Sequence, residues 1–256
     1  MKFTKVLALF AAAALAAVSF AACGGAASTG GSASGEKPVL SMATNAEFPP
    51  YEYYEGDKIV GIDAEVAALI AEKLGMTLEI SDVAFDSIIP GVQAGKYDMG
   101  MAGMTVSEER LQSVNFSTSY AKGIQVVIVP EDSDIATIDD IADKMIGVQT
   151  GTTGHIYASG DYGDDHVTMY DSGALAVEGL KGGKVDCVII DNEPAKAYVA
   201  ANEGLKILET EYANEDYAIC FSKENTELQE KVNKALEELI ADGSLQKVVD
   251  KYIPAE

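Results

Sequence analysis

Two strand-like segments of the sequence lead directly into polar segments that start helices, and these junctions limit the possible fold most strongly. The first strand, 98–102, runs into 103–110, and the second, 146–148, runs into the hydroxyl-rich segment 149–154. A helix N-terminus carries unpaired backbone N–H groups and a partial positive charge, so both junctions can hold an anion. The second junction lacks the lysine and the spacing of a P-loop, which makes phosphate binding a weak alternative.

Arg110 lies close to the start of the helix that is predicted after the first junction. Thr105 and Glu108 have the spacing of a capping box, and Ser107 is a second N-cap candidate. The guanidinium of Arg110 is a planar fork that can bind a carboxylate through two parallel hydrogen bonds. These residues predict a site for a small carboxylate, with an ordinary capped helix and a solvated arginine as the alternative.

Strand-like and helix-like segments alternate along the rest of the chain. Strands are predicted at 39–43, 77–80, from 97 to 102, and at 125–129, 146–148, 185–190, 206–208 and 217–221. Helices are predicted at 64–74 (with Asp63 as N-cap and Gly75 as C-cap), 86–95, 172–181, 193–202, 224–241 and around 245–252. The alternation predicts an α/β architecture with a largely parallel sheet.

Two segments at strand ends are candidates for ligand contacts. The loop 44–53 contains prolines that exclude a helix, and aromatic side chains that either pack beneath the loop or face a ligand. Asp191 follows the strand 185–190 at its carboxyl end, which is the edge of open α/β sheets where ligands bind. Taken alone, Asp191 is better explained as the N-cap of the next helix.

Residues 1–22 have the pattern of a secretory signal. Lys2 and Lys5 precede an apolar run at 6–20, which is short for a transmembrane helix. The end of this leader resembles a bacterial lipoprotein signal, in which Cys23 becomes the lipidated N-terminus. Phe20 departs from the leucine that is usual there, so plain secretion is the alternative. Residues 23–36 are mostly small or polar and are predicted to form a flexible tether.

The charge and the cysteines exclude several functions. The formal net charge of −23 argues against binding nucleic acid, or anionic lipid by charge. Cys187 and Cys220 lie in apolar segments and are predicted to be buried free thiols, with a disulfide as the alternative. No CxxC or histidine-rich spacing indicates a metal site, and we expect neither a metal nor a cofactor.

Several short segments, taken in their order and spacing, form one pattern: 43–53, 61–63, 102–110, 114–117, 148–153, Asp191 and 239–244. Together they resemble the extracellular solute-binding proteins of polar amino-acid ABC transporters. The resemblance implies a two-lobed, periplasmic-binding-protein-like fold of type II, whose lobes are joined by two crossover hinge strands. The first lobe would contain 37–121 and 217–256, and the second 122–216.

The resemblance also implies roles for individual residues. Arg110 would bind the α-carboxylate of the ligand, helped by Thr105 and by the backbone around Thr153. Asp191 would pair with the α-ammonium group, beside the Gly103 carbonyl and the Thr105 hydroxyl. A zwitterion that is buried between two lobes needs one cation and one anion, because an unpaired buried charge is costly.

The side chain of the ligand would be recognised elsewhere in the cleft. Phe48 and Phe85 match the aromatic wall of the family, and Asn45 and Gln149 occupy positions that contact the distal end of the ligand. Asn45 stands where many relatives have aspartate, which weakens the case for a cationic side chain, while Glu47 nearby reopens it. The first expectation is an uncharged, glutamine-like amino acid, with basic or sulfur-containing amino acids as alternatives.

The predicted function is that of an extracytoplasmic, membrane-anchored binding component of an ABC importer. A monomer, tethered by lipid on Cys23, would deliver a polar L-amino acid to the permease and its ATPase. The alternative is an enzyme of the cyclohexadienyl dehydratase type on the same fold, with Glu47 as the best candidate for a general acid or base. No Ser/His/Asp or Cys/His set is evident, so we expect no enzymatic activity. A receptor sensor domain, a third interpretation, would need a further segment after Glu256.

Overall fold

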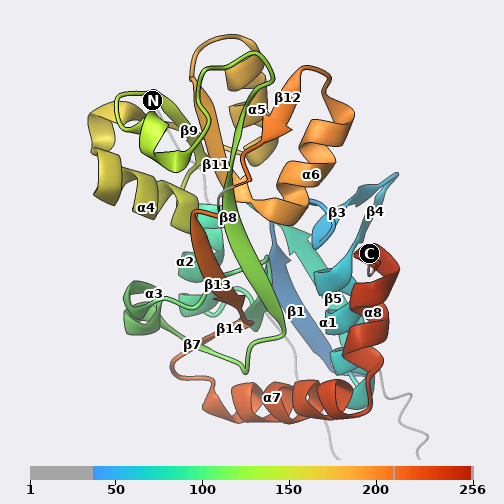
Figure 1. The fold of residues 1–256 in the computed structure, drawn as a ribbon. Coiled ribbons are helices and arrows are strands. Elements are labelled where there is room, and N and C mark those ends of the chain that lie inside the picture. Colours follow the sequence, from blue (N-terminus) through green and yellow to red (C-terminus); the bar gives the residue numbers. More distant parts are fainter. Residues whose placement is uncertain (1–36, 210, 255–256) are drawn as a thin grey trace, which may run out of the picture. The chain divides into compact units, whose positions relative to one another are not determined.

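A computed structural model describes residues 37–209 and 211–254 of the protein (Figure 1). The predicted signal, the tether and Cys23 lie outside the described residues. Two main β-sheets and one small sheet, together with the helices that pack on them, form the described part of the chain. None of the helices in these ranges is long and apolar enough to cross a membrane.

The first sheet has five strands in the order β5-β1-β6-β14-β7. Strands β5, β1 and β6 run parallel, whereas β14 pairs with β6 and β7 in the antiparallel direction. The strands are β1 (Val39–Thr44), β5 (Thr77–Asp82), β6 (Met99–Gly100), β7 (Val114–Phe116) and β14 (Cys220–Ser222). The helices of this half are α1 (Ile62–Lys73), the short η1 (Phe85–Ser87), α2 (Ile88–Gln93), α3 (Glu108–Ser113), α7 (Thr226–Ala241) and α8 (Ser244–Tyr252).

The second sheet has six strands, in the order β10-β9-β11-β8-β12 with β13 also paired to β8. Strands β10, β9 and β11 run parallel, and β8 is antiparallel to β11, β12 and β13. The strands are β8 (Ala121–Pro130), β9 (Ile146–Gln149), β10 (Val167–Tyr170), β11 (Cys187–Asp191), β12 (Leu205–Ile207) and β13 (Ala213–Tyr217). The helices are η2 (Ile138–Ile141), α4 (Thr153–Tyr162), η3 (Asp164–His166), α5 (Gly173–Lys181) and α6 (Asn192–Ala201).

The chain crosses between the two sheets twice. It passes from β7 to β8 and returns from β13 to β14, and β8 and β13 pair side by side from Ala121 opposite Tyr217 to Gln125 opposite Ala213 (Figure 1). The α/β prediction is confirmed, with one adjustment. Each sheet is parallel only in part, because the strands next to the crossings run against their neighbours.

Strand β8 is packed against apolar side chains on both faces of the second sheet. Val126 and Ile128 pack into the apolar cluster on one face of the second sheet, and Val127 and Val129 pack into the cluster on the other face. Successive side chains of a strand point to opposite faces, so a strand covered on both faces must be apolar throughout. The uninterrupted apolar run at 126–129 therefore belongs to a strand buried on both sides.

The aromatic loop contains a small antiparallel sheet that the sequence did not predict. Its strands are β2 (Glu47–Phe48), β3 (Glu52–Glu55) and β4 (Lys58–Val60). Strands this short give too few residues for a period-two pattern to be recognised. Tyr51 between them is buried, and its ring lies 5.3 Å from the ring of Tyr217, edge to face.

The starts of two helices differ from the prediction. Helix α1 begins at Ile62 with Gly61 in the N-cap position, so the predicted N-cap, Asp63, lies inside the helix and is fully buried. Its C-cap is Leu74 rather than Gly75. Glycine is required at 61, because its φ is +122° and a Cβ would meet the backbone oxygen of Tyr51.

The cap of α3 was also only partly predicted. Ser107 is the N-cap, and its Oγ accepts a hydrogen bond from the backbone N of Arg110 at 3.2 Å. Thr105 is not part of a capping box, so that prediction is wrong. Its hydroxyl is free to contact Glu215 and Thr153.

Both predicted free thiols are found. Cys187 and Cys220 are buried and unpaired, and burial raises the pKa of each thiol to about 12. At that pKa the thiolate, which is the reactive form, is scarcely populated near neutral pH. These cysteines act as small apolar residues.

Replacement of Gly123 by alanine is expected to destabilise the protein by about 1–3 kcal/mol, the usual cost of overpacking a filled site. A Cβ at this position of β8 would lie 2.4 Å from the ring of the fully buried Tyr217. Gly160→Ala, in the exposed part of α4 with open space around it, is the control and should stabilise by up to about 1 kcal/mol. Urea unfolding of both variants measures the difference, and equal stabilities would contradict the packing at Gly123.

Candidate ligand-binding site

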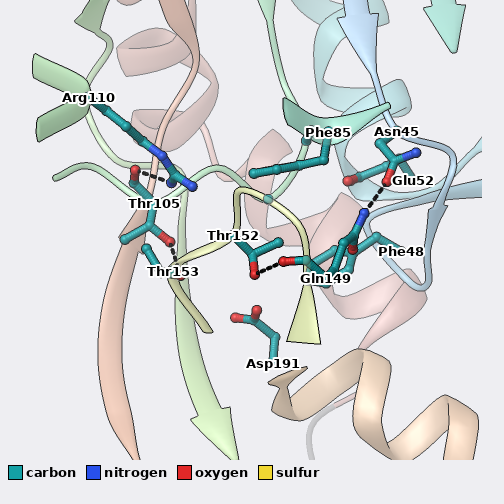
Figure 2. Close-up of a pocket in the computed structure, with 12 residues that line it drawn as sticks. Asn45, Phe48, Glu52, Phe85, Thr105, Arg110, Gln149, Thr152, Thr153 and Asp191 are labelled. Carbon is teal, nitrogen blue, oxygen red and sulfur yellow. Dashed lines mark hydrogen bonds between the residues drawn. The ribbon is translucent and has the colours of Figure 1, made fainter. Parts of the chain in front are cut away.

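One pocket is lined by all nine residues to which the resemblance assigns ligand roles, namely Asn45, Phe48, Phe85, Gly103, Thr105, Arg110, Gln149, Thr153 and Asp191 (Figure 2). Glu52, Ala102 and Thr152 line it as well. The pocket contains about 320 Å³ of space, part of it open to solvent.

The pocket lies where strands of both main sheets end. Asn45 follows β1 and Gly103 follows β6 in the first sheet, whereas Gln149 ends β9 and Asp191 ends β11 in the second. The carboxyl ends of neighbouring parallel strands share one edge of a sheet, which is the usual place for ligands in α/β folds. This topology brings together residues that are up to about 146 positions apart in sequence.

Arg110 is the only arginine of the chain, and it is nearly buried. Its Nη1 donates to the backbone oxygen of Thr105 at 2.8 Å, and its Nη2 donates to that of Gly151 at 3.1 Å. The guanidinium carbon also lies 5.4 Å from the centre of the Phe85 ring. A guanidinium has five N–H donors, so donors remain for a carboxylate in the pocket.

Asp191 occupies the N-cap position of α6, but its side chain makes no cap hydrogen bond. Its Oδ2 accepts from Nε2 of Gln125 at 2.7 Å, and its Oδ1 is buried without a donor. Burial, and next the nearby charge of Glu215, raise the pKa of Asp191 well above its usual range. A cationic group at Oδ1 would reverse this shift, so the carboxylate is suited to an ammonium ion.

Gly103 and Thr105 form the backbone turn beneath these charges. Gly103 has a φ of +51°, and a Cβ there would lie 2.8 Å from the ring of Phe48, so only glycine fits. The hydroxyl of Thr105 donates to Oε2 of Glu215 at 2.9 Å and lies 3.5 Å from the hydroxyl of Thr153. Residues of both sheets therefore meet at this end of the pocket.

Asn45 and Gln149 meet at the other end of the pocket. Nε2 of Gln149 donates to Oδ1 of Asn45 at 2.8 Å and to the backbone oxygen of Asp171 at 3.3 Å (Figure 2). Each amide keeps a second polar group, the NH₂ of Asn45 and the carbonyl of Gln149, that can contact a ligand. The two residues can serve the distal end of a polar side chain.

Glu47 does not line the pocket, contrary to the expectation that its carboxylate stands near the ligand. It lies in β2 and is exposed, and only its backbone oxygen makes a contact across the cleft, accepting from the Tyr198 hydroxyl at 2.6 Å. The acid that lines the pocket is Glu52, in the next strand of the small sheet. The alternation within this hairpin decides which glutamate points inward.

Glu52 and Asp63 form a buried carboxyl pair that the sequence did not reveal. Asp63 Oδ2 accepts from the Gly103 N–H at 2.9 Å and from the Tyr120 hydroxyl at 2.8 Å. Glu52 Oε2 and Asp63 Oδ1 are both buried without a donor, and a hydrogen bond between two carboxyl groups requires that one of them hold a proton. Burial and then the charge of Asp63 raise the pKa of Glu52 well above its usual range, and burial raises that of Asp63 to about 6.

A second buried pair, Gln125 and Glu215, lies behind the pocket and was also missed. Nε2 of Gln125 donates to Asp191 Oδ2 at 2.7 Å and to Glu215 Oε2 at 3.1 Å. From the sequence, Glu215 belongs to an acidic link that is predicted to be exposed to solvent. Gln125 is predicted to be the first residue of a strand. No local pattern distinguishes such residues from exposed ones, because their burial results from the pairing of β8 with β13.

Residues 40–255 match the model of the bacterial extracellular solute-binding proteins, family 3. The chain belongs to this family. The arginine-binding extracellular protein ArtP of Bacillus subtilis (strain 168) is 34% identical over 252 residues, which cover 94% of this chain and 96% of that protein.

Two solved structures resemble this family 3 protein closely. An ancestral arginine-binding protein bound to glutamine superposes with a TM-score of 0.81 at 38% identity, covering 86% of this chain and 99% of that one. The arginine-, lysine-, histidine-binding protein ArtJ of Geobacillus stearothermophilus gives a TM-score of 0.81 at 33% identity, covering 85% and 96%. The predicted family and two-lobed fold are confirmed. These relatives are binding proteins, which supports the binding role and not the dehydratase alternative.

The carboxyl pair makes a prediction for stability. Glu52→Gln supplies a permanent donor to Asp63 and should leave the free energy of unfolding near that of the wild type in mildly acidic solution. Asp63→Ala removes the acceptor of two buried donors, which costs about 1–3 kcal/mol for each donor left unpaired. Chemical unfolding monitored by circular dichroism measures both variants, and an Asp63→Ala protein as stable as Glu52→Gln would contradict the assignment.

The same variant gives a pH dependence. The pKa of Glu52 is raised in the folded protein, so the folded state holds a proton that the unfolded state releases. The wild type should therefore lose stability relative to Glu52→Gln as pH rises from the ordinary glutamate pKa towards the raised one. Unfolding curves at several pH values check this slope, and a constant difference between the two proteins would contradict the proton on Glu52.

Proposed function

We propose that this chain is the binding component of an ABC importer and holds an L-amino acid between a lobe of residues 37–121 and 217–256 and a lobe of residues 122–216. The observation that carries the proposal is the pair of opposite charges in one pocket. Arg110 comes from the part of the chain that forms the first sheet, and Asp191 comes from the second. An α-amino acid is a small molecule with one anion and one cation at fixed separation, which matches that pair.

In the proposed complex, Arg110 binds the α-carboxylate and Asp191 binds the α-ammonium group. The remaining N–H groups of the guanidinium, together with the backbone at the start of α4 near Thr153, surround the carboxylate. The ligand then links the two lobes through its own charges. Because it contacts both lobes only when they are closed, its binding shifts the population towards the closed form.

The charges around the pocket favour a basic side chain on the ligand. Among the described residues that line or directly back the pocket, the acids are Glu52, Asp63, Asp191 and Glu215, and Arg110 is the only cation. Glu52 also lines the pocket and can ionise when a cation approaches it. Since ArtP is an arginine-binding protein by name, arginine is the leading ligand, in place of the glutamine-like ligand first expected from the sequence.

Glutamine is the second candidate. The amides of Asn45 and Gln149 cannot ionise, and they offer a donor and an acceptor that suit the terminal amide of glutamine. An ancestral arginine-binding protein has been solved with glutamine bound, so the two ligands can share one architecture. Glu52 would keep its proton in that complex.

The proposal includes an extracytoplasmic location and no chemical conversion of the ligand. Membership of an extracellular family supports the location. We further propose a lipid anchor on Cys23, a monomeric state, and delivery to a permease with its ATPase. Mass spectrometry of ligand recovered after incubation tests the lack of catalysis, since an enzyme would return a product of altered mass.

Calorimetry tests the proposed function directly. L-Arginine is expected to bind the wild type with micromolar or tighter affinity, and L-glutamine more weakly. Arg110→Ala removes one partner of a buried charge pair, which costs about 2–5 kcal/mol or about 30- to 5,000-fold in affinity. Arg110→Lys keeps the charge without the planar fork and should lose at least about tenfold. Lys196→Ala, in an exposed ion pair with Glu193, is the control. Lack of binding by all twenty amino acids would overturn the proposal.

Binding should release protons in mildly acidic solution. The raised pKa of Asp191 means that part of the free protein is protonated there, while an ammonium ion favours the charged carboxylate. Affinity is therefore highest above that pKa and falls as the pH is lowered through it. Calorimetry in two buffers of different ionisation enthalpy measures the release, which should decrease in Asp191→Asn. Equal release by wild type and variant would contradict this role.

A further inference from the structure

Glu215 is a buried carboxylate that lies behind the pocket and does not line it. It lies in β13, one of the two strands at the crossings, and is 5% exposed. Its Oε2 accepts two hydrogen bonds, from the hydroxyl of Thr105 at 2.9 Å and from Nε2 of Gln125 at 3.1 Å. Its Oε1 is buried without a donor. The side chain therefore contacts residues on both sides of the site.

The contact with Thr105 has a fixed direction. A hydroxyl has one proton and two lone pairs, and an ionised carboxylate can only accept. The Thr105 proton is therefore directed to Glu215, and only lone pairs of Oγ1 face the pocket. Where the hydroxyls of Thr105 and Thr153 approach to 3.5 Å, Thr153 has to be the donor. Thr105 can accept a hydrogen bond from a ligand but cannot donate one.

Glu215 is also connected to Asp191 through Gln125, and Asp191 likewise presents a hydrogen-bond acceptor to the pocket. The NH₂ group of Gln125 lies between the two carboxylates and donates to one oxygen of each. The second oxygen of Asp191 is buried and lacks a donor. This end of the pocket thus offers acceptors from Asp191 and Thr105, and the groups behind them keep both in that role.

We propose that Glu215 is a positioning residue that makes this end of the pocket selective for an α-ammonium group, by keeping Thr105 a hydrogen-bond acceptor and, through Gln125, holding Asp191 in place. The inference rests on the proposed function. An ammonium group has three donors for these acceptors. An α-hydroxy acid with the same side chain has only one donor and leaves a buried acceptor unpaired, which is how polar sites reject analogues.

The charged groups that face Glu215 agree with a role in charge placement. Arg110 from α3, Asp191 from β11 and Tyr157 from α4 lie close enough to interact with it electrostatically. The charge of Glu215 is also a cause of the raised pKa of Asp191. Replacement of Glu215 by glutamine should therefore lower the pH at which ligand affinity falls on acidification. Loss of packing alone would not produce this shift.

The main test replaces Glu215 by glutamine, whose NH₂ can donate to Thr105 and turn the hydroxyl proton towards the pocket. L-Arginine is the probe, with binding measured by calorimetry. Glu215→Gln should weaken binding at least tenfold, while Asp216→Asn, the same change on the neighbouring, half-exposed residue of β13, should stay within twofold of wild type. A loss of less than tenfold in a folded Glu215→Gln protein overturns the inference.

Two further measurements separate positioning from structure. In a Thr105→Val background, Glu215→Gln should cost less affinity than it costs in the wild type, because the contact with the hydroxyl is gone and only the contact through Gln125 remains. An equal or larger cost overturns the inference. The wild type should bind L-arginine more tightly than its α-hydroxy analogue. In Glu215→Gln the ratio of these two affinities should be at least tenfold smaller. An unchanged preference likewise overturns it.

Thr105 variants cover the case in which Glu215→Gln does not fold. Thr105→Ser keeps the hydroxyl and should bind within threefold of wild type, whereas Thr105→Val should lose at least tenfold. Equal affinities of these two variants overturn the inference. A wild type that binds no amino acid refutes the proposed function and this inference with it, whereas normal binding by wild type and Glu215→Gln alike refutes the inference alone.

Discussion

The pocket depends on how Arg110 is held. Its guanidinium donates to the backbone oxygens of Thr105 and Gly151, which precede helices associated with the first and the second sheet. A long, flexible side chain is thereby fixed in one orientation, with its planar face near Phe85. A lysine has no fork with which to bind two carbonyls and still present donors to a ligand. Lysine occupies every other strongly basic position of the chain. Arginine at 110 is therefore explained by the planar shape of its guanidinium and not by its charge alone.

One buried cation is surrounded by a larger number of buried acids, and the structure lowers the cost of this imbalance in two ways. Burial raises the pKa of both Glu52 and Asp63, which favours a proton on this pair and so lowers its charge. Asp191 and Glu215 are separated by the NH₂ group of Gln125, which donates to both. Burial of like charges without such groups would cost several kcal/mol. The arrangement leaves Asp191 with an oxygen that lacks a donor, and the free energy of pairing it becomes available to a ligand.

The sequence predicted most helices and strands of the two main sheets and nine of the twelve residues that line the pocket, but not the small sheet, Glu52 or the groups behind the pocket. Strand-to-helix junctions and the family pattern are local, and they located Arg110, Gln149 and Asp191 because each lies where a strand ends or a helix starts. Glu52 and Glu215 are acids in polar segments, and only strand pairing buries them. Glu47 and Glu52 were indistinguishable by composition. In the folded hairpin, Glu52 points towards the pocket and Glu47 does not. Strands of two and four residues are too short for an alternating pattern of side chains to be recognised in the sequence.

The charged groups behind the pocket also decide what its neutral groups can do. A threonine hydroxyl or a side-chain amide can serve as donor or acceptor, so its presence in a sequence does not fix the partner it selects. At Thr105 the carboxylate of Glu215 takes the proton. At Gly103 the backbone N–H donates to Asp63, so the only backbone group of this residue left for a ligand is its carbonyl oxygen, an acceptor. Asp63 and Glu215, which do not themselves line the pocket, thus bind the donors of these two residues and leave acceptors for the ligand. The buried acids therefore determine that the pocket offers hydrogen-bond acceptors near Thr105 and Gly103. The part of the ligand that carries hydrogen-bond donors must lie at that end of the pocket.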